Sequence, residues 1–288
     1  MKEFSGKVAV ITGAAGGLGM ALARQAAKRG MKLVLADVDR QALAANVESL
    51  RAQGVEAIGI VTDVSVPAQL DALAAATLDA FGAVHLLFNN AGVGAGGFVW
   101  ENTANDWQWV WGVNVLGVVN GLRAFVPHML KQGEPAHIVN TASVAGLLAP
   151  AMLGLYNATK HAVIGLTETL YNDLKMTGAP VYCSVLCPAF FDTGIASSDR
   201  TRPPELQNDT AMTASQRVAS AQLRKAVKSG KLSAEQVAEK TFDAIGAGQF
   251  YILTHPAAKP AIDLRLEDLA LERNPSDPYT YKPDVKPR

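Results

Sequence analysis

The sequence predicts an α/β fold in which a doubly wound parallel sheet carries helices on both faces. Short apolar runs rich in β-branched residues alternate with helical stretches of about ten to fifteen residues, which is typical of successive strand–helix–strand units. The first run leads directly into a glycine-rich turn and a helix. Polar residues follow several later runs, and parallel sheets bind ligands at the carboxyl ends of their strands.

The composition is that of a globular protein. Hydrophobic residues make up 49% of the 288 and charged residues 18%, which is enough for a sizeable core. The 26 basic and 26 acidic residues cancel, so nothing favours nucleic acid as a partner. The apolar stretch 110–122 contains Asn114 and Asn120, which argues against a membrane span, and the apolar run 8–11 is too short for a signal peptide. We therefore expect a cytoplasmic protein.

The histidines do not suggest a metal site, and the cysteines do not suggest a disulfide. The five histidines are scattered without ligand spacing, so we expect no metal site. Cys183 and Cys187 flank a strand-like run that would hold them too far apart for a disulfide. We expect both to be buried thiols.

The first predicted strand, residues 7–12, leads into the turn Gly13-Ala14-Ala15-Gly16-Gly17-Leu18-Gly19 and a helix that ends near Gly30. Glycines allow the backbone to approach a pyrophosphate closely, and the helix N-terminus offers unpaired N–H groups. We interpret this segment as a phosphate-binding turn. An ordinary glycine-rich connection is the alternative.

The second strand, residues 32–36, ends at Asp37, eighteen residues after Gly19. A carboxylate here would accept hydrogen bonds from the hydroxyls of an adenosine ribose and would repel a 2′-phosphate. Asp37 therefore favours NAD over NADP, although the nearby Arg40 keeps NADP open.

The alternation then continues through residue 92. We predict, in order, a helix over 41–53, a strand over 56–61 followed by Asp63, a helix over 67–81 capped by Ser65, and a strand over 84–88 followed by Asn89-Asn90-Ala91-Gly92.

All four tryptophans lie between Trp100 and Trp111. Thr103 and Asp106 have the spacing of a capping box, which predicts one long helix from there to about residue 130. Packing in a core or subunit interface is the simpler interpretation of the aromatic residues. The alternative is that Phe98 or Trp100 forms a wall of an apolar substrate pocket.

A fifth strand over 136–142 places Ser143 at the same edge of the sheet. Tyr156 and Lys160 follow at i and i+4 of a helix that runs to about residue 177, so their side chains share one face. An ammonium beside a phenol would lower the pKa of the phenol from about 10. Ser143 could then hold a substrate oxygen against the tyrosine.

The rest of the chain predicts one domain over 1–255 and a tail over 256–288. A sixth strand, 180–186, leads into an irregular segment over 194–211, long enough to be a lid within a substrate loop of about 190–230. Two helices capped by Thr213 and Ser233 and a last strand over 250–254 complete the domain. A helix over 260–273 and a proline-rich end form the tail, which we expect on the surface or on a partner subunit.

Together these motifs resemble the classical short-chain dehydrogenase/reductase family over about residues 5–254. The resemblance rests on Thr12-Gly13-x-x-x-Gly17-x-Gly19, Asn89-Asn90-Ala91-Gly92, Asn114, Ser143 and Tyr156-x-x-x-Lys160. It implies a Rossmann-like sheet of about seven strands and hydride transfer between a nicotinamide cofactor and an alcohol or carbonyl carbon.

The resemblance also implies roles for individual residues. Tyr156 would be the acid/base, Lys160 would bind the nicotinamide ribose, Ser143 would hold the substrate oxygen and Asn114 would fix a water. The implied cofactor contacts are Gly13, Gly16, Gly17, Leu18, Gly19, Asp37, Val38, Asp63, Val64, Asn90, Ala91, Gly92, Tyr156, Lys160, Pro188, Ala189, Phe191 and Thr193. Besides Ser143 and Tyr156, the residues expected around the substrate are Phe98, Trp100, Leu147, Met152, Leu153, Phe190 and Phe191.

These side chains predict a bulky apolar secondary alcohol or ketone as substrate, aromatic ones included. One rival hypothesis is an NADPH-dependent carbonyl reductase that uses Arg40, and another is a nucleotide-sensing or scaffold protein without turnover. Two departures from the family pattern matter. Ala189 stands where the family usually has glycine, and the chain extends past the usual end. We expect a homodimer or a homotetramer.

Overall fold

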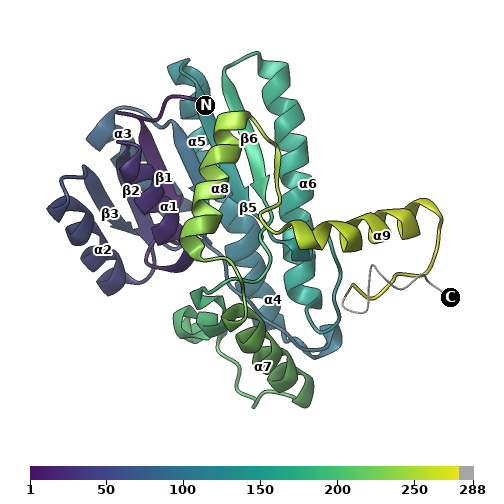
Figure 1. Ribbon diagram of the computed structural model, residues 1–288. Coiled ribbons are helices and arrows are strands. Elements are labelled where there is room, and N and C mark those ends of the chain that lie inside the picture. The colour runs from purple at the N-terminus through teal and green to yellow at the C-terminus, as the bar shows by residue number, and fades with distance from the viewer. Residues whose placement is uncertain (279–288) are drawn as a thin grey trace.

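The computed structural model describes residues 1–278, and residues 279–288 of the predicted tail lie outside the described part. Among the described residues, seven parallel strands form one sheet in the order β3-β2-β1-β4-β5-β6-β7 (Figure 1). The strands are β1 (Val8–Thr12), β2 (Lys32–Asp37), β3 (Ala57–Val61), β4 (Leu86–Asn89), β5 (Ala136–Thr141), β6 (Val181–Leu186) and β7 (Tyr251–Ile252). This confirms the predicted parallel sheet.

Helices cover both faces of the sheet, as predicted. In chain order, the helices of the described residues are α1 (Gly17–Lys28), α2 (Arg40–Ala52), α3 (Pro67–Phe81), α4 (Ala104–Trp111), α5 (Gly117–Gln132), α6 (Gly154–Thr177), α7 (Ala214–Lys228), α8 (Ala234–Ala247) and α9 (Lys259–Ala270). Most of the predicted boundaries are correct to within two residues. The last strand is shorter than expected, because only residues 251 and 252 pair with β6.

Successive residues of each strand point to opposite faces and build two separate cores. Ile11 packs with Phe242 of α8 in the core that also contains α1 and α2. Its neighbour Val10 packs with Phe125 of α5 in the core that also contains α3 and α6. Both strand residues are fully buried, which explains why the strands are continuous apolar runs rather than alternating ones.

Side-chain caps fix several helix starts. Thr103, Thr213 and Ser233 form the predicted capping boxes at α4, α7 and α8. Ser65 does not cap α3. Its N–H and hydroxyl both donate to Asp63 Oδ1, and Val66 occupies the cap position without a side-chain hydrogen bond.

The expected single helix up to residue 130 is interrupted. A π-helical turn, η2 (Gly112–Leu116), separates α4 from α5 and contains Asn114. The combined helix over 104–132 is long and apolar enough to span a membrane by composition alone, but 61% of its most apolar window is buried inside the protein. Its apolar side chains are those of a core helix.

The segment over 194–211 is more regular than predicted. It contains the 3-10 turns η4 (Gly194–Thr201) and η5 (Pro204–Leu206). Helix α9 projects from the body of the molecule (Figure 1). After Glu272, which has a left-handed φ of 54°, the chain turns back, and the N–H of Ser276 donates to Asp268 Oδ2 at 3.0 Å.

Candidate active site

A cavity of about 500 Å³ opens at the carboxyl edge of the sheet, where the strand order reverses between β1 and β4. Its walls come from the loops that follow β1 to β6, from α4, and from the segment between β6 and α7. Many of the predicted site residues line it, namely Gly13, Gly16, Leu18, Asp37, Val38, Asp63, Val64, Asn90, Ala91, Gly92, Ser143, Leu153, Tyr156, Lys160, Pro188, Ala189, Phe190, Phe191 and Thr193.

The glycine turn fits a phosphate group. Gly13 has a φ of +66°, and a Cβ at this position would lie 2.8 Å from Ala91 Cα. A Cβ at Gly19 would lie only 2.0 Å from the carbonyl oxygen of Gly13, so this glycine allows α1 to pack against the turn. A Cβ at Gly16 would meet no protein atom within 4 Å, although Gly16 lines the cavity. The open space there, at a helix N-terminus that no side chain caps, suits a pyrophosphate.

Asp37 holds the end of β2 against this turn. Its carboxylate accepts hydrogen bonds from the N–H of Ala15 at 2.8 Å and from the N–H of Asp39 at 3.0 Å. The side chain of Asn46 reinforces the turn by donating to the carbonyl of Ala15 at 2.9 Å. Arg40 is exposed and does not line the cavity. The carboxylate of Asp37, rather than the guanidinium of Arg40, therefore lines this part of the cavity.

Thr12 joins the ends of β1 and β4. Its hydroxyl accepts hydrogen bonds from the N–H groups of Asn90 and Ala91 at 2.9 and 3.1 Å. The amide of Asn90 donates back to the carbonyl of Thr12 at 2.9 Å. These bonds explain why a threonine precedes the glycine turn, and they fix the position of the Asn90 side chain beside the cavity.

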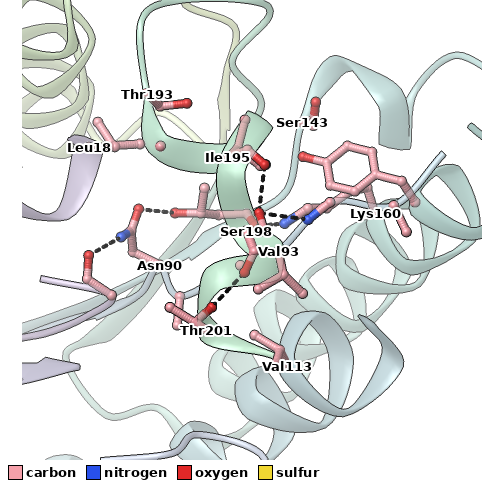
Figure 2. A pocket seen from close by; sticks show the side chains of 18 of the residues that line it. Leu18, Asn90, Val93, Val113, Ser143, Lys160, Thr193, Ile195, Ser198 and Thr201 are labelled. Carbon is pink, nitrogen blue, oxygen red and sulfur yellow. Dashed lines mark hydrogen bonds between the residues drawn. The ribbon is translucent and has the colours of Figure 1, made fainter. Parts of the chain in front are cut away.

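Ser143, Tyr156 and Lys160 meet on one side of the cavity. Figure 2 shows Ser143 and Lys160 together on the side opposite Leu18 and Asn90. The Nζ of Lys160 lies 5.6 Å from the centre of the Tyr156 ring and donates to the carbonyl oxygen of Thr141 at 2.9 Å. The hydroxyl of Ser143 donates to the carbonyl of Pro188 at 3.2 Å. The juxtaposition of these three side chains is the one expected from the sequence.

The prediction that the pKa of Tyr156 is lowered is wrong for the protein without bound ligands. Burial raises the pKa of Tyr156 to about 12, and the hydrogen bond with Ser143 lowers it by less. Burial also lowers the pKa of Lys160 to about 8. Removal from water disfavours the charged form of each group, and burial is the largest cause of both shifts.

Asn114 uses its side chain to hold the loop after β4. Its Oδ1 accepts from the N–H of Val93 at 2.8 Å, while its Nδ2 donates to the carbonyl of Val93 at 3.0 Å and to the hydroxyl of Thr159 at 3.1 Å. Both amide hydrogens are therefore taken by protein groups. The predicted water-fixing role of Asn114 stays a prediction.

Ala189 fits its loop without strain. Among the described residues other than glycine, only Met152 and Glu272 have a positive φ. Ala189 therefore occupies a backbone conformation open to any residue, and its N–H donates to His255 Nδ1 at 3.1 Å. The loop geometry does not depend on a glycine here.

The substrate-side predictions were partly wrong. Leu153, Phe190 and Phe191 line the cavity, but Phe98 and Trp100 do not. The rings of Phe98 and Trp100 stack on each other on the surface with centroids 4.9 Å apart, and Trp100 is 76% exposed. Leu147 also lies outside the cavity and packs in a small core cluster with α6, and Met152 lines a smaller neighbouring cavity. Further apolar lining residues that the sequence analysis missed are Trp109, Val113, Leu148, Ile195, Leu206 and Leu223.

The segment after β6 is pinned across the cavity at three points. The hydroxyl of Ser198 accepts from the N–H of Gly94 at 3.2 Å, and Arg200 Nη1 lies 2.9 Å from Asp39 Oδ2. Arg202 Nη1 lies 2.7 Å from Asp106 Oδ1, and both of these side chains are more than 90% buried. Sequence reasoning missed these pairs, because each joins residues far apart along the chain.

Three further observations concern the tail, metal binding and the cysteines. Pro278, the last described residue, also lines the cavity, so the described tail reaches the site instead of lying only on the surface. Within residues 1–278, no group of three or more histidine, cysteine, aspartate or glutamate side chains is placed to hold a metal ion. Cys183 and Cys187 are buried free thiols, as predicted.

Comparison with known proteins identifies the class defined by this fold and site. Residues 7–204 match the family model described as short chain dehydrogenase. The chain therefore belongs to the short-chain dehydrogenase family of oxidoreductases, which confirms the resemblance found in the sequence.

Individual relatives cover nearly the whole chain. The "CLA biosynthesis dehydrogenase/reductase" of Lactiplantibacillus plantarum is 33% identical over 277 residues, which span 96% of this chain and 97% of the relative. The "C alpha-dehydrogenase" of a Sphingobium strain is 35% identical over 91% of this chain and 85% of its own length. A crystal structure of a short-chain dehydrogenase/reductase from Burkholderia phymatum in complex with NAD is 62% identical, with a TM-score of 0.96 over 98% of this chain and 100% of that one.

Proposed function

We propose that this protein is an NAD-dependent dehydrogenase that interconverts a bulky, apolar secondary alcohol and its ketone. One observation carries the proposal. A single cavity joins the glycine turn and Asp37 at one end to Ser143, Tyr156 and Lys160 at the other. A dinucleotide held by the turn would extend toward the tyrosine, where a carbon could react.

The residues present fit NAD better than NADP. Asp37 lines the cavity, and a carboxylate there favours the free 2′-hydroxyl of an adenosine ribose and repels a 2′-phosphate. Arg40, the residue on which the NADP alternative rests, is exposed and outside the cavity. The Burkholderia phymatum relative, which is 62% identical, binds NAD, and this supports the same choice here.

When bound, the nicotinamide would take a hydride from the alcohol carbon or return one to the ketone. The chain supplies the proton chemistry. The phenol of Tyr156 gives a proton to the ketone oxygen in reduction, and its phenolate takes that proton from the alcohol in oxidation. The hydroxyl of Ser143 holds the substrate oxygen at this position. Lys160, when protonated, stabilises the phenolate and binds the nicotinamide ribose.

The cavity wall supports an apolar substrate. Trp109, Leu148, Leu153, Phe190 and Leu206 contribute large apolar side chains. Its only lysine or arginine side chains among the described residues are Lys160, placed at the reacting end, and Arg200, already paired with Asp39. A phosphorylated or strongly anionic substrate would find no unpaired cluster of cations. One relative, from Streptomyces exfoliatus, is named a 1-deoxy-11-beta-hydroxypentalenate dehydrogenase, a name that describes a hydroxylated substrate.

We further propose that the protein is a homodimer or homotetramer. Trp111, Leu116 and Val119 lie on the combined α4–α5 helix and are 37–44% exposed. Neighbouring apolar side chains on one long helix would be covered by a second copy of the chain. Light scattering of the purified protein would test this, and a monomer at micromolar concentration would contradict it.

The reaction is tested by NADH formation from NAD⁺ over a panel of bulky secondary alcohols. The wild type is run beside Tyr156→Phe, with NADP⁺ in parallel. We expect turnover with NAD⁺ that disappears in the variant while NAD⁺ still binds. Turnover with NADP⁺ alone would overturn the cofactor assignment, and turnover that survives the substitution would overturn the role of Tyr156. Tight NAD⁺ binding without turnover of any alcohol or ketone would favour a nucleotide-sensing protein.

A further inference from the structure

A second cavity of about 340 Å³ lies next to the first. It is lined by one face of α7, by the loop before α6 and by one residue of the loop after β6. The lining residues are Ala151, Met152, Leu153, Phe190, Ala219, Gln222, Leu223 and Ala226. Gln222 is the single polar side chain among them. The second cavity is therefore an apolar space, and the proposed reaction does not use it.

The two cavities are continuous in their walls. Leu153, Phe190 and Leu223 line both of them. These three side chains form the boundary between the reacting end, where Ser143 and Tyr156 lie, and the second cavity. An apolar group on the reacting carbon that reached the second cavity would therefore contact these three apolar side chains on its way.

The shape of the second cavity follows from the backbone positions of α7 and of the loop that carries Met152. Positions 219, 222, 223 and 226 of α7 follow helical spacing and present one face, and the small side chains of Ala219 and Ala226 leave room on it. Met152 opposite has a left-handed φ of 61°, and its carbonyl accepts the N–H of Gly97 at 2.8 Å. A conformation that is unfavourable for a residue with a side chain persists only where its surroundings fix it.

The N-terminus of α7 is also fixed. The hydroxyl of Thr213 donates to the Glu101 carboxylate at 2.6 Å, Ser215 makes a further hydrogen bond to the same carboxylate, and the N–H of Phe98 donates to Ser215 Oγ at 2.9 Å. These contacts join the start of α7 to residues 98–101, and the adjacent Gly97 is hydrogen-bonded to the carbonyl of Met152. The space between them is therefore maintained by polar anchors outside it.

We propose that the second cavity binds the remote apolar part of the substrate. The substrates are then elongated secondary alcohols or ketones, with the reacting carbon beside Tyr156 and an alkyl chain or second ring packed between Met152 and Ala226. This inference rests on the proposed function, because it places the reacting carbon by that reaction. It goes further by assigning a separate subsite and a shape to the substrate.

Burial of each additional methylene group in such a subsite should raise kcat/KM about fourfold. The gain should continue with chain length until the second cavity is filled and then stop. A substrate short enough to stay in the first cavity should show no dependence on the side chains of α7 that line only the second.

The test is a homologous series of 2-alkanols from 2-butanol to 2-dodecanol with NAD⁺, applied to three proteins. The wild type is compared with Ala226→Phe, which fills the second cavity, and with Ala221→Phe. Residue 221 is exposed on another side of α7, so the control adds the same ring to the same helix outside the cavity. We expect Ala226→Phe to lose at least tenfold in kcat/KM for the long alcohols and to keep the wild-type value for the short ones. Ala221→Phe should match the wild type throughout.

Binding of the corresponding 2-alkanones, measured by calorimetry on the same proteins, separates this inference from the reaction. A loss of long-ketone binding confined to Ala226→Phe supports the subsite even where no alcohol is turned over, in which case the proposed reaction fails by itself. A uniform loss across all chain lengths, or wild-type affinity that does not rise with chain length, overturns the subsite. Ala226→Leu repeats the test with a smaller side chain, should the phenylalanine variant fail to fold.

Discussion

The guanidinium of Arg200 lies 2.9 Å from the carboxylate of Asp39, although 161 positions separate the two residues. Asp39 caps α2 two residues after Asp37, the last residue of β2, and Arg200 lies in the segment that crosses the cavity. This ion pair therefore joins the part of the cavity next to Asp37 to the segment after β6 that crosses the cavity. Its side chains are 57% and 26% exposed, so it adds little to the stability of the fold.

We expect Arg200→Gln to weaken NAD⁺ binding several-fold, because the ion pair with Asp39 holds the segment after β6 across the cavity. The melting temperature should stay within a few degrees of wild type, because this exposed pair is not part of the core. Fluorescence titration and thermal unfolding measure the two effects. The matched control is Arg24→Gln, which removes another exposed pair, with Glu235, outside the cavity. Equal effects of the two substitutions on NAD⁺ affinity would contradict the proposed role of Arg200.

Two substitutions in the glycine turn should have separate effects, one on NAD⁺ binding and the other on the stability of the fold. Gly16 has an extended φ of −171°, and a Cβ there points into open space, so Gly16→Ala should fold normally. Its methyl group would occupy the position proposed for the pyrophosphate, and we expect NAD⁺ affinity to fall at least tenfold. Gly19→Ala should instead unfold at much lower denaturant, because its Cβ would overlap the carbonyl of Gly13. Undiminished NAD⁺ binding by Gly16→Ala would place the cofactor elsewhere.

The raised pKa of Tyr156 predicts different pH profiles for alcohol oxidation and ketone reduction. With a pKa of about 12, the phenol is protonated at neutral pH, which suits it as the acid in ketone reduction. The phenolate needed for alcohol oxidation becomes more populated as the pH rises. We therefore expect kcat/KM for oxidation to rise between pH 6 and 8, below the pKa of about 8 at which Lys160 loses the charge that stabilises the phenolate, and kcat/KM for reduction to stay nearly level. An oxidation rate independent of pH over this range would show that another group controls the proton.

Buried His137 predicts a loss of stability in mild acid. Burial lowers the pKa of His137 to about 3 from 6.5, so the unfolded chain binds a proton at this residue between these pH values and the folded protein does not. The stability supplied by its neutral form is complete above pH 6.5 and decreases as the pH falls. The decrease should be about 1.4 kcal/mol per pH unit below 6.5.

His137→Gln removes this titrating group and keeps a side chain that can reach Ser184, which lies 2.8 Å from the histidine ring. Chemical denaturation at pH 6, 5 and 4 should therefore show a smaller pH dependence in this variant. His128→Gln, on the exposed side of α5, is the control and should keep the wild-type slope. The same slope in all three proteins would mean that other groups govern acid unfolding.

Much of the fold and of the site could be predicted from the sequence because their signals are local. The alternation of apolar runs and helices predicts the parallel sheet, and the capping boxes at Thr103, Thr213 and Ser233 mark the starts of α4, α7 and α8. Tyr156 and Lys160 share a helix face by spacing alone. Parallel strands bring their carboxyl ends to one edge, so the turn after β1 and the residues after β4 and β5 had to meet.

Other features depend on where distant segments pack. Phe98 and Trp100 are large and apolar, yet they lie on the surface, because the chain between β4 and α4 turns their stacked rings outward. The pKa of Tyr156 rises instead of falling, because the burial of the phenol exceeds the effect of its neighbours.

The sequence predicted the order of strands and helices, the glycine turn and the candidate catalytic side chains, since the signal for each comes from residues close together in the chain. The packing of distant segments was needed to show which side chains line the cavity, how Arg200 and Arg202 hold the segment after β6, and that a second cavity adjoins the first. These features arise from contacts between segments that are distant along the chain, such as Arg202 with Asp106. Burial, the desolvation of charges and the shape of an empty space exist only once such segments have packed together.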